Sequence, residues 1–190
     1  MRIIAGTYRS RALAAPSGLA TRPTSDRLRE TLFNVLTPRI EGANFLDLYA
    51  GSGAVGMEAL SRGAAHVEFV ERAEPALRVL RANLARLGLT AGFRIHAAGV
   101  AGVLRNMKPI AAFDVVFLDP PYQMRDAYGE TLRMLAHSSL IWAMSLVIAE
   151  HEKRFDPGEE FGLLRRFRKL AQGSAALSFY RMGSAGDLRV

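Results

Sequence analysis

The sequence of 190 residues contains no cysteine, which excludes disulfide bonds and metal sites built on thiolates. It has no uninterrupted apolar run of the roughly 18–20 residues that a membrane-spanning helix needs. The longest candidate, residues 139–149, has the length of a buried strand. Arg2, Arg9 and Arg11 interrupt the region where a secretory signal would need an apolar core. We therefore expect a cytoplasmic protein with no membrane partner, and we assign no metal site.

Acidic residues are fewer than basic ones, 18 against 25, and the net charge is +7. Residues 1–42 hold seven Arg or Lys against three acids, residues 151–190 hold eight against five, and residues 43–150 hold ten of each. Two basic ends around a neutral middle suit a polyanionic partner such as nucleic acid. A generic solubilising surface would explain the charge as well, so charge alone does not decide the partner.

The stretch 45–56 is the central motif, because an apolar run leads into three closely spaced glycines and then into helical spacing of apolar residues. This order is typical of the first strand, turn and helix of a doubly wound α/β sheet, whose glycines let a ligand approach the helix N-terminus. Asp47 lies in the strand, where a carboxylate is costly unless it has hydrogen-bond donors. The stretch predicts a cofactor site just beyond the carboxyl end of this strand.

The rest of the chain alternates helical and strand-like patterns, which favours right-handed crossovers and a parallel sheet. The last two strand-like runs are separated by a short Gln172-Gly173 turn and must therefore pair antiparallel. We predict a seven-stranded, mostly parallel, doubly wound sheet with an antiparallel last strand, preceded by a small basic arm or hairpin. The expected helices cover residues 28–36, with Thr24 or Ser25 as N-cap, 77–87, closed by Gly88, and 130–136. The expected strands cover residues 45–49, 66–71, 93–97, 113–119, a run ending at 150, 163–171 and 175–181.

Two features suit an adenosine cofactor without identifying it. The pattern Gly51-x-Gly53-x-x-Gly56 is weak by itself and also fits a nicotinamide dinucleotide. Glu71 ends the second strand, twenty residues after Gly51, where a carboxylate can accept both hydroxyls of a ribose. A surface glutamate at a strand end is the alternative interpretation of Glu71.

A more selective motif is Asp119-Pro120-Pro121-Tyr122, directly after the fourth strand and at the same edge of the sheet as the glycines. The prolines restrict the backbone, so that their carbonyls can point into a cleft. Asp119 adds an acceptor and Tyr122 offers a ring for stacking on a planar base. Two acceptors beside a stacking ring suit the amino group of a nucleobase. Paired prolines alone would be better explained as a stiff loop, but the four residues together favour a site.

The glycine pattern and this tetrapeptide resemble those of class I S-adenosylmethionine-dependent methyltransferases that modify exocyclic amino groups. The antiparallel terminal pair is also similar to that class and is not expected in a dinucleotide-binding fold. Further motifs narrow the resemblance to the bacterial 16S rRNA guanine-N2 methyltransferase family, over nearly the whole chain. These motifs lie at residues 1–6, 22–26, 29–34, 47–53, 58–63 and 117–122.

The resemblance implies transfer of a methyl group from S-adenosylmethionine to the N2 amino group of a guanine in 16S rRNA. We further expect a monomer that acts on an assembling 30S particle, with residues 1–40 contacting RNA and residues 41–190 forming the methyltransferase domain, although the sequence does not decide between naked rRNA and a particle or fix the oligomeric state. Three sets of residues carry the implied roles. The cofactor set is Asp47, Gly51, Ser52 and Gly53 at the methionine end and Glu71 at the ribose. The catalytic set around the flipped guanine is Asp119, the Pro120 carbonyl and Tyr122. The RNA-contacting set is Pro121, Arg2, Arg9, Arg11, Arg22 and Arg29.

One departure and three alternatives stay open. Residues 96–100 lack the acid or amide that many members of the class place beside the adenine, so this contact is unassigned. An adenine-N6 methyltransferase acting on DNA or RNA would use the same tetrapeptide. A nicotinamide-dependent oxidoreductase would explain the glycines and Glu71 but would leave residues 119–122 unused. A non-catalytic RNA-binding module with a vestigial pocket is disfavoured by the intact Asp119 and Glu71.

Overall fold

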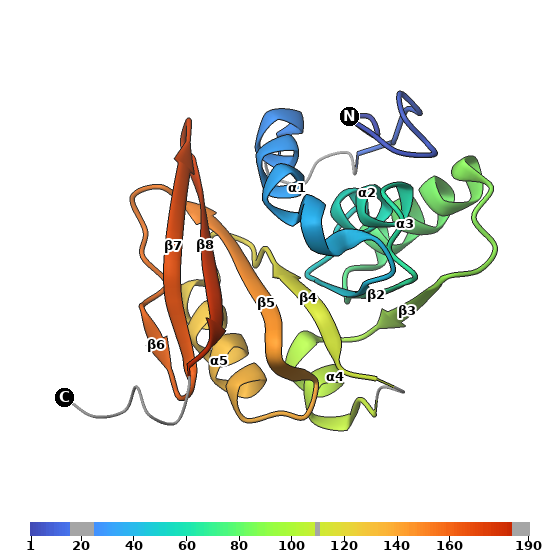
Figure 1. Cartoon of the computed structure of the whole chain (residues 1–190). Helices are drawn as coiled ribbons and strands as arrows, with labels where there is room; N and C mark the ends of the chain where they lie inside the picture. The colour runs from blue at the N-terminus through green and yellow to red at the C-terminus, as the bar shows by residue number, and fades with distance from the viewer. Residues whose placement is uncertain (16–24, 109–110, 184–190) are drawn as a thin grey trace.

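The computed structural model describes residues 1–15, 25–108 and 111–183 (Figure 1). Their strands are β1 (Asn44–Leu48), β2 (His66–Glu71), β3 (Phe93–Ala97), β4 (Phe113–Leu118), β5 (Ile141–Glu152), β6 (Glu160–Phe161), β7 (Leu164–Gln172) and β8 (Ala175–Met182). Their helices are α1 (Asp26–Ile40), α2 (Ala54–Ser61), α3 (Glu74–Leu87), α4 (Val100–Asn106) and α5 (Arg125–Ala136). The strands form one sheet in the order β3-β2-β1-β4-β5-β8-β7-β6.

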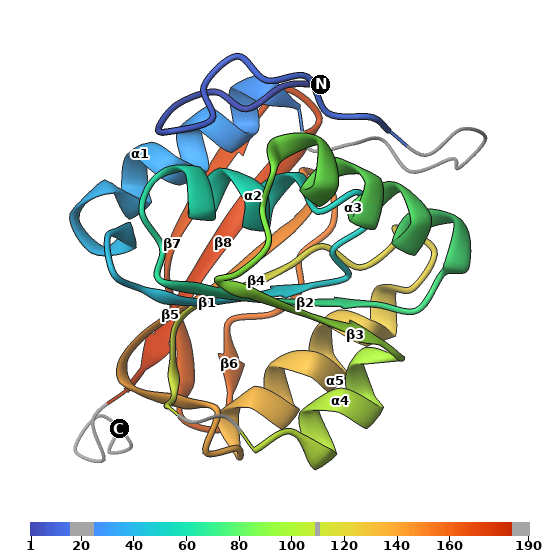
Figure 2. The ribbon, with the colours of Figure 1, turned by 90° about the vertical axis from the view of Figure 1, so that its right-hand side faces the viewer.

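Helices cover both faces of the sheet, with α1, α2 and α3 on one face and α4 and α5 on the other (Figure 2). β1 pairs in parallel with β2 and β4, and the parallel pairing continues to β3 on one side and β5 on the other. Because these strands are parallel, their carboxyl ends meet at one edge, where ligands bind in open α/β sheets. The predicted doubly wound, mostly parallel sheet is confirmed.

The far side of the sheet is antiparallel, since β8 lies between β5 and β7 and runs against both. The predicted antiparallel last strand is thereby confirmed, but the predicted number of strands is wrong. The described residues form eight strands, because β6 adds a two-residue pairing in which Phe161 lies opposite Leu164 across Gly162, whose φ is +60°. A strand of two residues has no alternating pattern to detect in the sequence.

Local signals set several helix ends. The Ser25 hydroxyl accepts a hydrogen bond from Leu28 N at 3.2 Å, so Ser25 is the N-cap of α1. Thr24, the other candidate, lies outside the described residues. α3 ends at Gly88, whose φ of +73° is the left-handed conformation of a helix C-cap. α5 begins at Arg125, earlier than predicted, and the seven-residue α4 was not predicted.

Residues 1–15, here called the N-terminal hairpin, lie outside the sheet and pack over the α1–α2 side (Figure 2). An antiparallel bridge joins Arg2 to Ala12, which confirms a hairpin at this end of the chain. Ile3 and Leu13 are buried and belong to the same apolar core as α1, α2 and the sheet. None of the helices in the described residues is long and apolar enough to cross a membrane.

Candidate active site

A pocket of about 480 Å³ opens at the carboxyl ends of β1, β2 and β4. Its walls come from the turn after β1, the end of β2, residues 98–102 at the start of α4, and residues 119–124 after β4. A pocket of this size can take a nucleoside-sized ligand. It brings together most of the cofactor and base-binding residues predicted from the sequence, namely Asp47, Gly51, Ser52, Glu71, Asp119, Pro120, Pro121 and Tyr122.

The glycines after β1 divide into two kinds. Gly51, with φ of +55°, lines the pocket and leaves the backbone accessible to a ligand. Gly53, with φ of +78°, is instead the N-cap of α2, and a Cβ there would lie 2.8 Å from Met57 Cε. At Gly56 a Cβ would lie 2.3 Å from the Phe69 ring. Gly56 therefore allows α2 to pack on β2, whereas Gly53 leaves room for the Met57 side chain, and neither glycine lines the pocket.

Asp47, one residue before the end of β1, is buried, and its Oδ2 accepts a hydrogen bond from Gly56 N at 2.9 Å. Burial raises the pKa of the Asp47 carboxyl to about 7, and the negative charge of Glu71 adds to the rise. The hydrogen bond from Gly56 opposes both effects. At neutral pH in the absence of ligand, this carboxyl therefore holds a proton for much of the time.

The raised pKa of Asp47 predicts a pH-dependent loss of stability. The folded protein keeps a proton that the unfolded chain, with an Asp pKa near 3.8, releases. The contribution of Asp47 to stability is therefore complete below about pH 4 and is lost as the pH rises to about 7. We expect Asp47→Asn, which keeps an oxygen acceptor for Gly56, to gain stability relative to the wild type over this interval. Urea unfolding at each pH measures the difference, and a difference independent of pH would contradict the assignment.

Glu71 ties the turn after β1 to the end of β2. Its Oε2 accepts from Gly51 N at 2.9 Å, and its Oε1 accepts from Arg72 N at 2.8 Å and Ala73 N at 2.7 Å. A carboxylate offers about four lone-pair sites, so about one remains for a ligand hydroxyl while these bonds are kept. Accepting both hydroxyls of a ribose would require the Gly51 bond to give way.

Asp119 lies at the pocket floor, immediately after β4, and is half-buried. Burial raises the pKa of its carboxyl well above the ordinary value, and the charges of Glu150 and Asp47 raise it further. Leu118 pairs with Ala149 in the parallel register, which places Asp119 beside Glu150. The ends of β1, β4 and β5 thus gather three carboxyl groups.

Two tyrosines that the sequence analysis did not select, Tyr128 of α5 and Tyr49 after β1, link α5 to the pocket. The Tyr128 hydroxyl donates to the Glu150 carbonyl at 2.9 Å and lies 3.4 Å from the Pro120 carbonyl. Tyr49 lines the pocket with a left-handed φ of +61°, which costs a non-glycine residue of order 1–3 kcal/mol. Its hydroxyl is 2.9 Å from Thr131 Oγ1, so α5 contacts both pocket loops. No sequence pattern marks a tyrosine for a positive φ.

The arginines predicted to contact RNA fall into three groups. Arg2, Arg9 and Arg11 are exposed on the N-terminal hairpin, whereas Arg22 lies outside the described residues. The prediction for Arg29 is wrong, because its side chain has no exposed surface.

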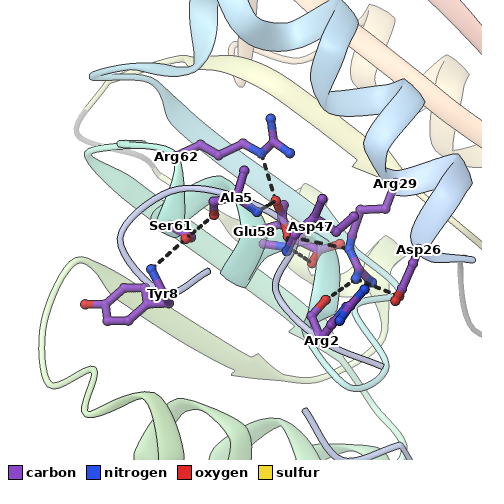
Figure 3. Close-up of polar contacts among 11 residues, drawn as sticks. Arg2, Ala5, Tyr8, Asp26, Arg29, Asp47, Glu58, Ser61 and Arg62 are labelled. Carbon is purple, nitrogen blue, oxygen red and sulfur yellow. Dashed lines mark hydrogen bonds and ion pairs between the residues drawn. The ribbon is translucent and has the colours of Figure 1, made fainter. Parts of the chain in front are cut away.

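Arg29 is held inside the molecule by a network of charged and polar groups (Figure 3). It donates to the Arg2 carbonyl and to Asp26 Oδ1 at 3.0 Å, and its Nε lies 3.7 Å from Glu58 Oε2. The Glu58 carboxylate accepts from Ile4 N at 2.8 Å, Ala5 N at 3.0 Å and Arg62 Nε at 2.8 Å. Arg29 and Glu58 therefore anchor the hairpin and are not free to contact phosphates.

Comparisons with known proteins extend over nearly the whole chain. The profile of a family described as "Conserved hypothetical protein 95" matches residues 1–181. YlbH of Bacillus subtilis (strain 168) is 34% identical over 182 residues, which cover 95% of this chain and 98% of that protein. "Ribosomal RNA small subunit methyltransferase D" of Escherichia coli (strain K12) is 38% identical over 152 residues, which cover 80% of this chain and 75% of that protein.

A solved structure shares the fold at similar coverage. The yhhF protein from Escherichia coli superposes with a TM-score of 0.81 at 34% identity, over 96% of this chain and 98% of that one. The sheet order and the antiparallel β8 are thus those of a class I methyltransferase fold.

Proposed function

Because the chain belongs to the Conserved hypothetical protein 95 family, we propose that it transfers a methyl group from S-adenosylmethionine to the N2 amino group of a guanine in 16S rRNA. Membership confirms the resemblance inferred from the motifs. The relatives of Escherichia coli and Haemophilus influenzae are both named ribosomal RNA small subunit methyltransferase D. The chain is accordingly an rRNA methyltransferase, and its cofactor is S-adenosylmethionine.

One observation carries the residue-level proposal: the 119–122 loop and the turn after β1 open into the same pocket. The pocket has the volume for a nucleoside-sized ligand, and its carboxylates suit a cofactor with a net positive charge. The residues therefore fit S-adenosylmethionine. We assign Asp47, Gly51 and Ser52 to its methionine end and Glu71 to its ribose. Gly53 supports the conformation of the turn without lining the pocket.

We also propose how the adenine is held, a contact that the sequence left unassigned. Residues 98–102 line the pocket and have only small or apolar side chains, from Ala98 to Gly102. Adenine would be held there by apolar packing and backbone groups, with no acidic side chain needed.

The protein contributes to the reaction mainly by aligning the guanine amino group with the methyl group of the cofactor. S-adenosylmethionine, when bound, supplies a methyl group that its sulfonium has already activated. Asp119 and the Pro120 carbonyl accept hydrogen bonds from the guanine amino group, which orients its lone pair and stabilises the positive charge that develops on nitrogen. Tyr122 stacks on the base and offsets the few kcal/mol that leaving the RNA stack costs. Tyr128, by contacting the Pro120 and Glu150 carbonyls, holds the loop in place.

A transfer assay over several polymers tests this function. Purified protein with labelled S-adenosylmethionine is incubated with 30S particles, free 16S rRNA and duplex DNA. We expect label in 16S rRNA, with the assembling 30S particle as the preferred form, and a monomeric protein of the cytoplasm. Label in DNA alone would favour the adenine-N6 alternative. The oxidoreductase alternative is set aside because the named relatives are methyltransferases.

We also propose that residues 1–40 supply RNA contact to the methyltransferase domain of residues 41–190. Exposed Arg2 and Arg9 face a hollow of about 360 Å³ that Arg27 also lines, between the N-terminal hairpin and the start of α1. Such a group of guanidinium ions suits phosphate contacts.

Removing two positive charges from the N-terminal hairpin tests this contact. We expect Arg9→Gln/Arg11→Gln to weaken rRNA binding and to reduce the slope of log Kd against log salt by about 1.5, since each phosphate contact contributes about 0.7–0.9. The affinity for S-adenosylhomocysteine should not change. Arg105→Gln/Lys108→Gln is the matched control, because both residues are exposed at the end of α4, on the other face of the sheet. Equal slopes in the two double variants would contradict the proposal.

A further inference from the structure

The basic surplus of residues 151–190 is not used by the proposed site, and half of its basic residues lie on one strand. Of the eight Arg and Lys residues in this segment, four belong to β7, at the side of the sheet away from α2 and α3 (Figure 1). Two of the four share an acidic partner, since Arg166 contacts Asp156 Oδ1 at 2.6 Å and Lys169 contacts Asp156 Oδ2 at 3.4 Å. These two charges are compensated within the molecule.

Arg168 of β7 and Arg181 of β8 differ from that pair. Both residues are exposed, and none of the ion pairs among the described residues involves either of them. Arg181 lies opposite Arg165 in the antiparallel register, and Arg165 contacts Glu160 at 2.5 Å. The neighbouring acid therefore serves Arg165. Two guanidinium charges face solvent with no acidic partner in the described part of the chain.

Phe167 lies between these two arginines because of a β-bulge. Arg166 pairs with Tyr180 and Arg168 pairs with Phe179, so Phe167 is the extra residue of β7. Its ring is 47% exposed, although its centroid lies 5.3 Å from the guanidinium carbon of Arg181 and 6.4 Å from the centroid of the Phe179 ring. These contacts hold an aromatic ring in a defined position while much of its surface stays open to solvent.

The three side chains of Phe167, Arg168 and Arg181, here called the Phe167 patch, share one face of the sheet. Phe179, which lies beneath them, belongs to the apolar core that α1 completes, so the patch is on the face that carries α1 and the N-terminal hairpin (Figure 2). Tyr180 pairs with Val147, four residues and about 13 Å before His151 near the carboxyl end of β5. The patch is therefore well separated from the pocket at the carboxyl edge of the sheet.

An exposed ring between two uncompensated guanidinium groups suits single-stranded RNA. A base can stack on an aromatic ring, and guanidinium groups bind the phosphates on either side of it. An apolar protein surface would cover the ring but would desolvate two charges without supplying partners for them. The alternation of base and phosphate along an RNA strand matches both parts of the patch.

We propose that the Phe167 patch is a second RNA-contacting surface, which stacks an unpaired base of the substrate on Phe167 and holds neighbouring phosphates with Arg168 and Arg181. The inference rests on the proposed function and deepens it, because it gives the basic C-terminal segment a partner. The patch lies away from the pocket, so it binds a part of the RNA other than the guanine that is methylated. It contributes to the affinity for RNA and takes no part in the transfer itself.

Removing the two charges tests the phosphate contacts. The full chain is titrated with 16S rRNA at several salt concentrations. We expect Arg168→Gln/Arg181→Gln to reduce the slope of log Kd against log salt by about 1.5, since each phosphate contact contributes about 0.7–0.9. Arg105→Gln/Lys108→Gln removes the same charge from the other face of the sheet and should keep the wild-type slope. Equal slopes in the two double variants would overturn the phosphate contacts.

Removing the ring tests the stacking contact separately from charge. We expect Phe167→Ala to weaken rRNA binding by about 5- to 150-fold, the usual effect of losing one base–aromatic stack, and to leave the salt slope unchanged. Phe167→Tyr keeps the ring and should bind as the wild type does. Wild-type affinity in Phe167→Ala would overturn the stacking contact. If Phe167→Ala does not fold, as urea unfolding would show, the arginine variant still decides whether the surface binds RNA.

Kinetics separate this surface from the pocket. In transfer assays the KM for 16S rRNA should rise in the arginine variant and in Phe167→Ala, while kcat and the affinity for S-adenosylhomocysteine stay at wild-type values. If both variants bound free rRNA normally and lost transfer only on 30S particles, the patch would bind a ribosomal protein, and the inference would be overturned. That result would leave the proposed function standing. No label in 16S rRNA with the wild-type protein would instead contradict the proposed function itself.

Discussion

Replacing Asp119 by alanine is expected to lower the rate of methyl transfer by about 10²–10³-fold, the usual cost of removing one group that stabilises developing charge. The side chain lies at the floor of the pocket that also holds the turn after β1, so it is in position to contact the reacting amino group. Cofactor binding should be nearly intact, because the residues assigned to the cofactor come from β1 and β2. Single-turnover transfer to 16S rRNA measures the rate, and calorimetry with S-adenosylhomocysteine measures binding.

Asp126→Ala is the matched control for this variant. Asp126 is an exposed aspartate in the first turn of α5, just after the same loop, and it does not line the pocket. We expect its transfer rate to stay close to that of the wild type. A transfer rate in Asp119→Ala equal to that of Asp126→Ala would rule out the assignment.

The second large effect concerns stability. Glu58→Ala should lower the free energy of unfolding by about 3–5 kcal/mol, as expected when one partner of a buried charge pair is removed. Both Glu58 and Arg29 have side chains with no exposed surface, so the loss removes the buried partner of Arg29 and leaves its charge with only the exposed Asp26 carboxylate. The Ile4 and Ala5 amides lose their acceptor as well. The N-terminal hairpin should then open locally.

Urea unfolding measures the change, and hydrogen exchange at Ile4 and Ala5 reports on the hairpin. Glu30→Ala, an exposed glutamate on α1, should change stability by less than about 0.5 kcal/mol. The double variant Arg29→Met/Glu58→Leu should recover part of the loss, because it buries no unpaired charge. If Glu58→Ala were as stable as Glu30→Ala, the network in Figure 3 would not hold the hairpin in place.

The sequence was most informative where a local pattern is sufficient to determine the structure. The apolar runs of β1 and β4 required two buried faces, and Ser25 and Gly88 marked helix ends through their own hydrogen bonds and φ angles. Two motifs placed after parallel strands must come together at one sheet edge, so the pocket followed from topology.

Features that depend on partners distant in sequence were harder to predict from the sequence. Arg29 was interpreted as an exposed phosphate contact, although it lies three, four and seven residues before Leu32, Phe33 and Leu36, on the buried face of α1. That spacing was the available signal, but the partner that makes burial tolerable, Glu58, comes from α2. The positive φ of Tyr49 likewise depends on tertiary contacts, among them the one with Thr131.

The most direct test of the central claim identifies the methylated atom. 30S particles and 16S rRNA from a strain lacking this activity are incubated with the protein and methyl-deuterated S-adenosylmethionine, and the digested nucleosides are analysed by mass spectrometry. The account predicts deuterated N2-methylguanosine at a single position, formed about 10²–10³-fold more slowly when Asp119→Ala replaces the wild type. Deuterium in N6-methyladenosine, or no labelled nucleoside in 16S rRNA, would contradict it.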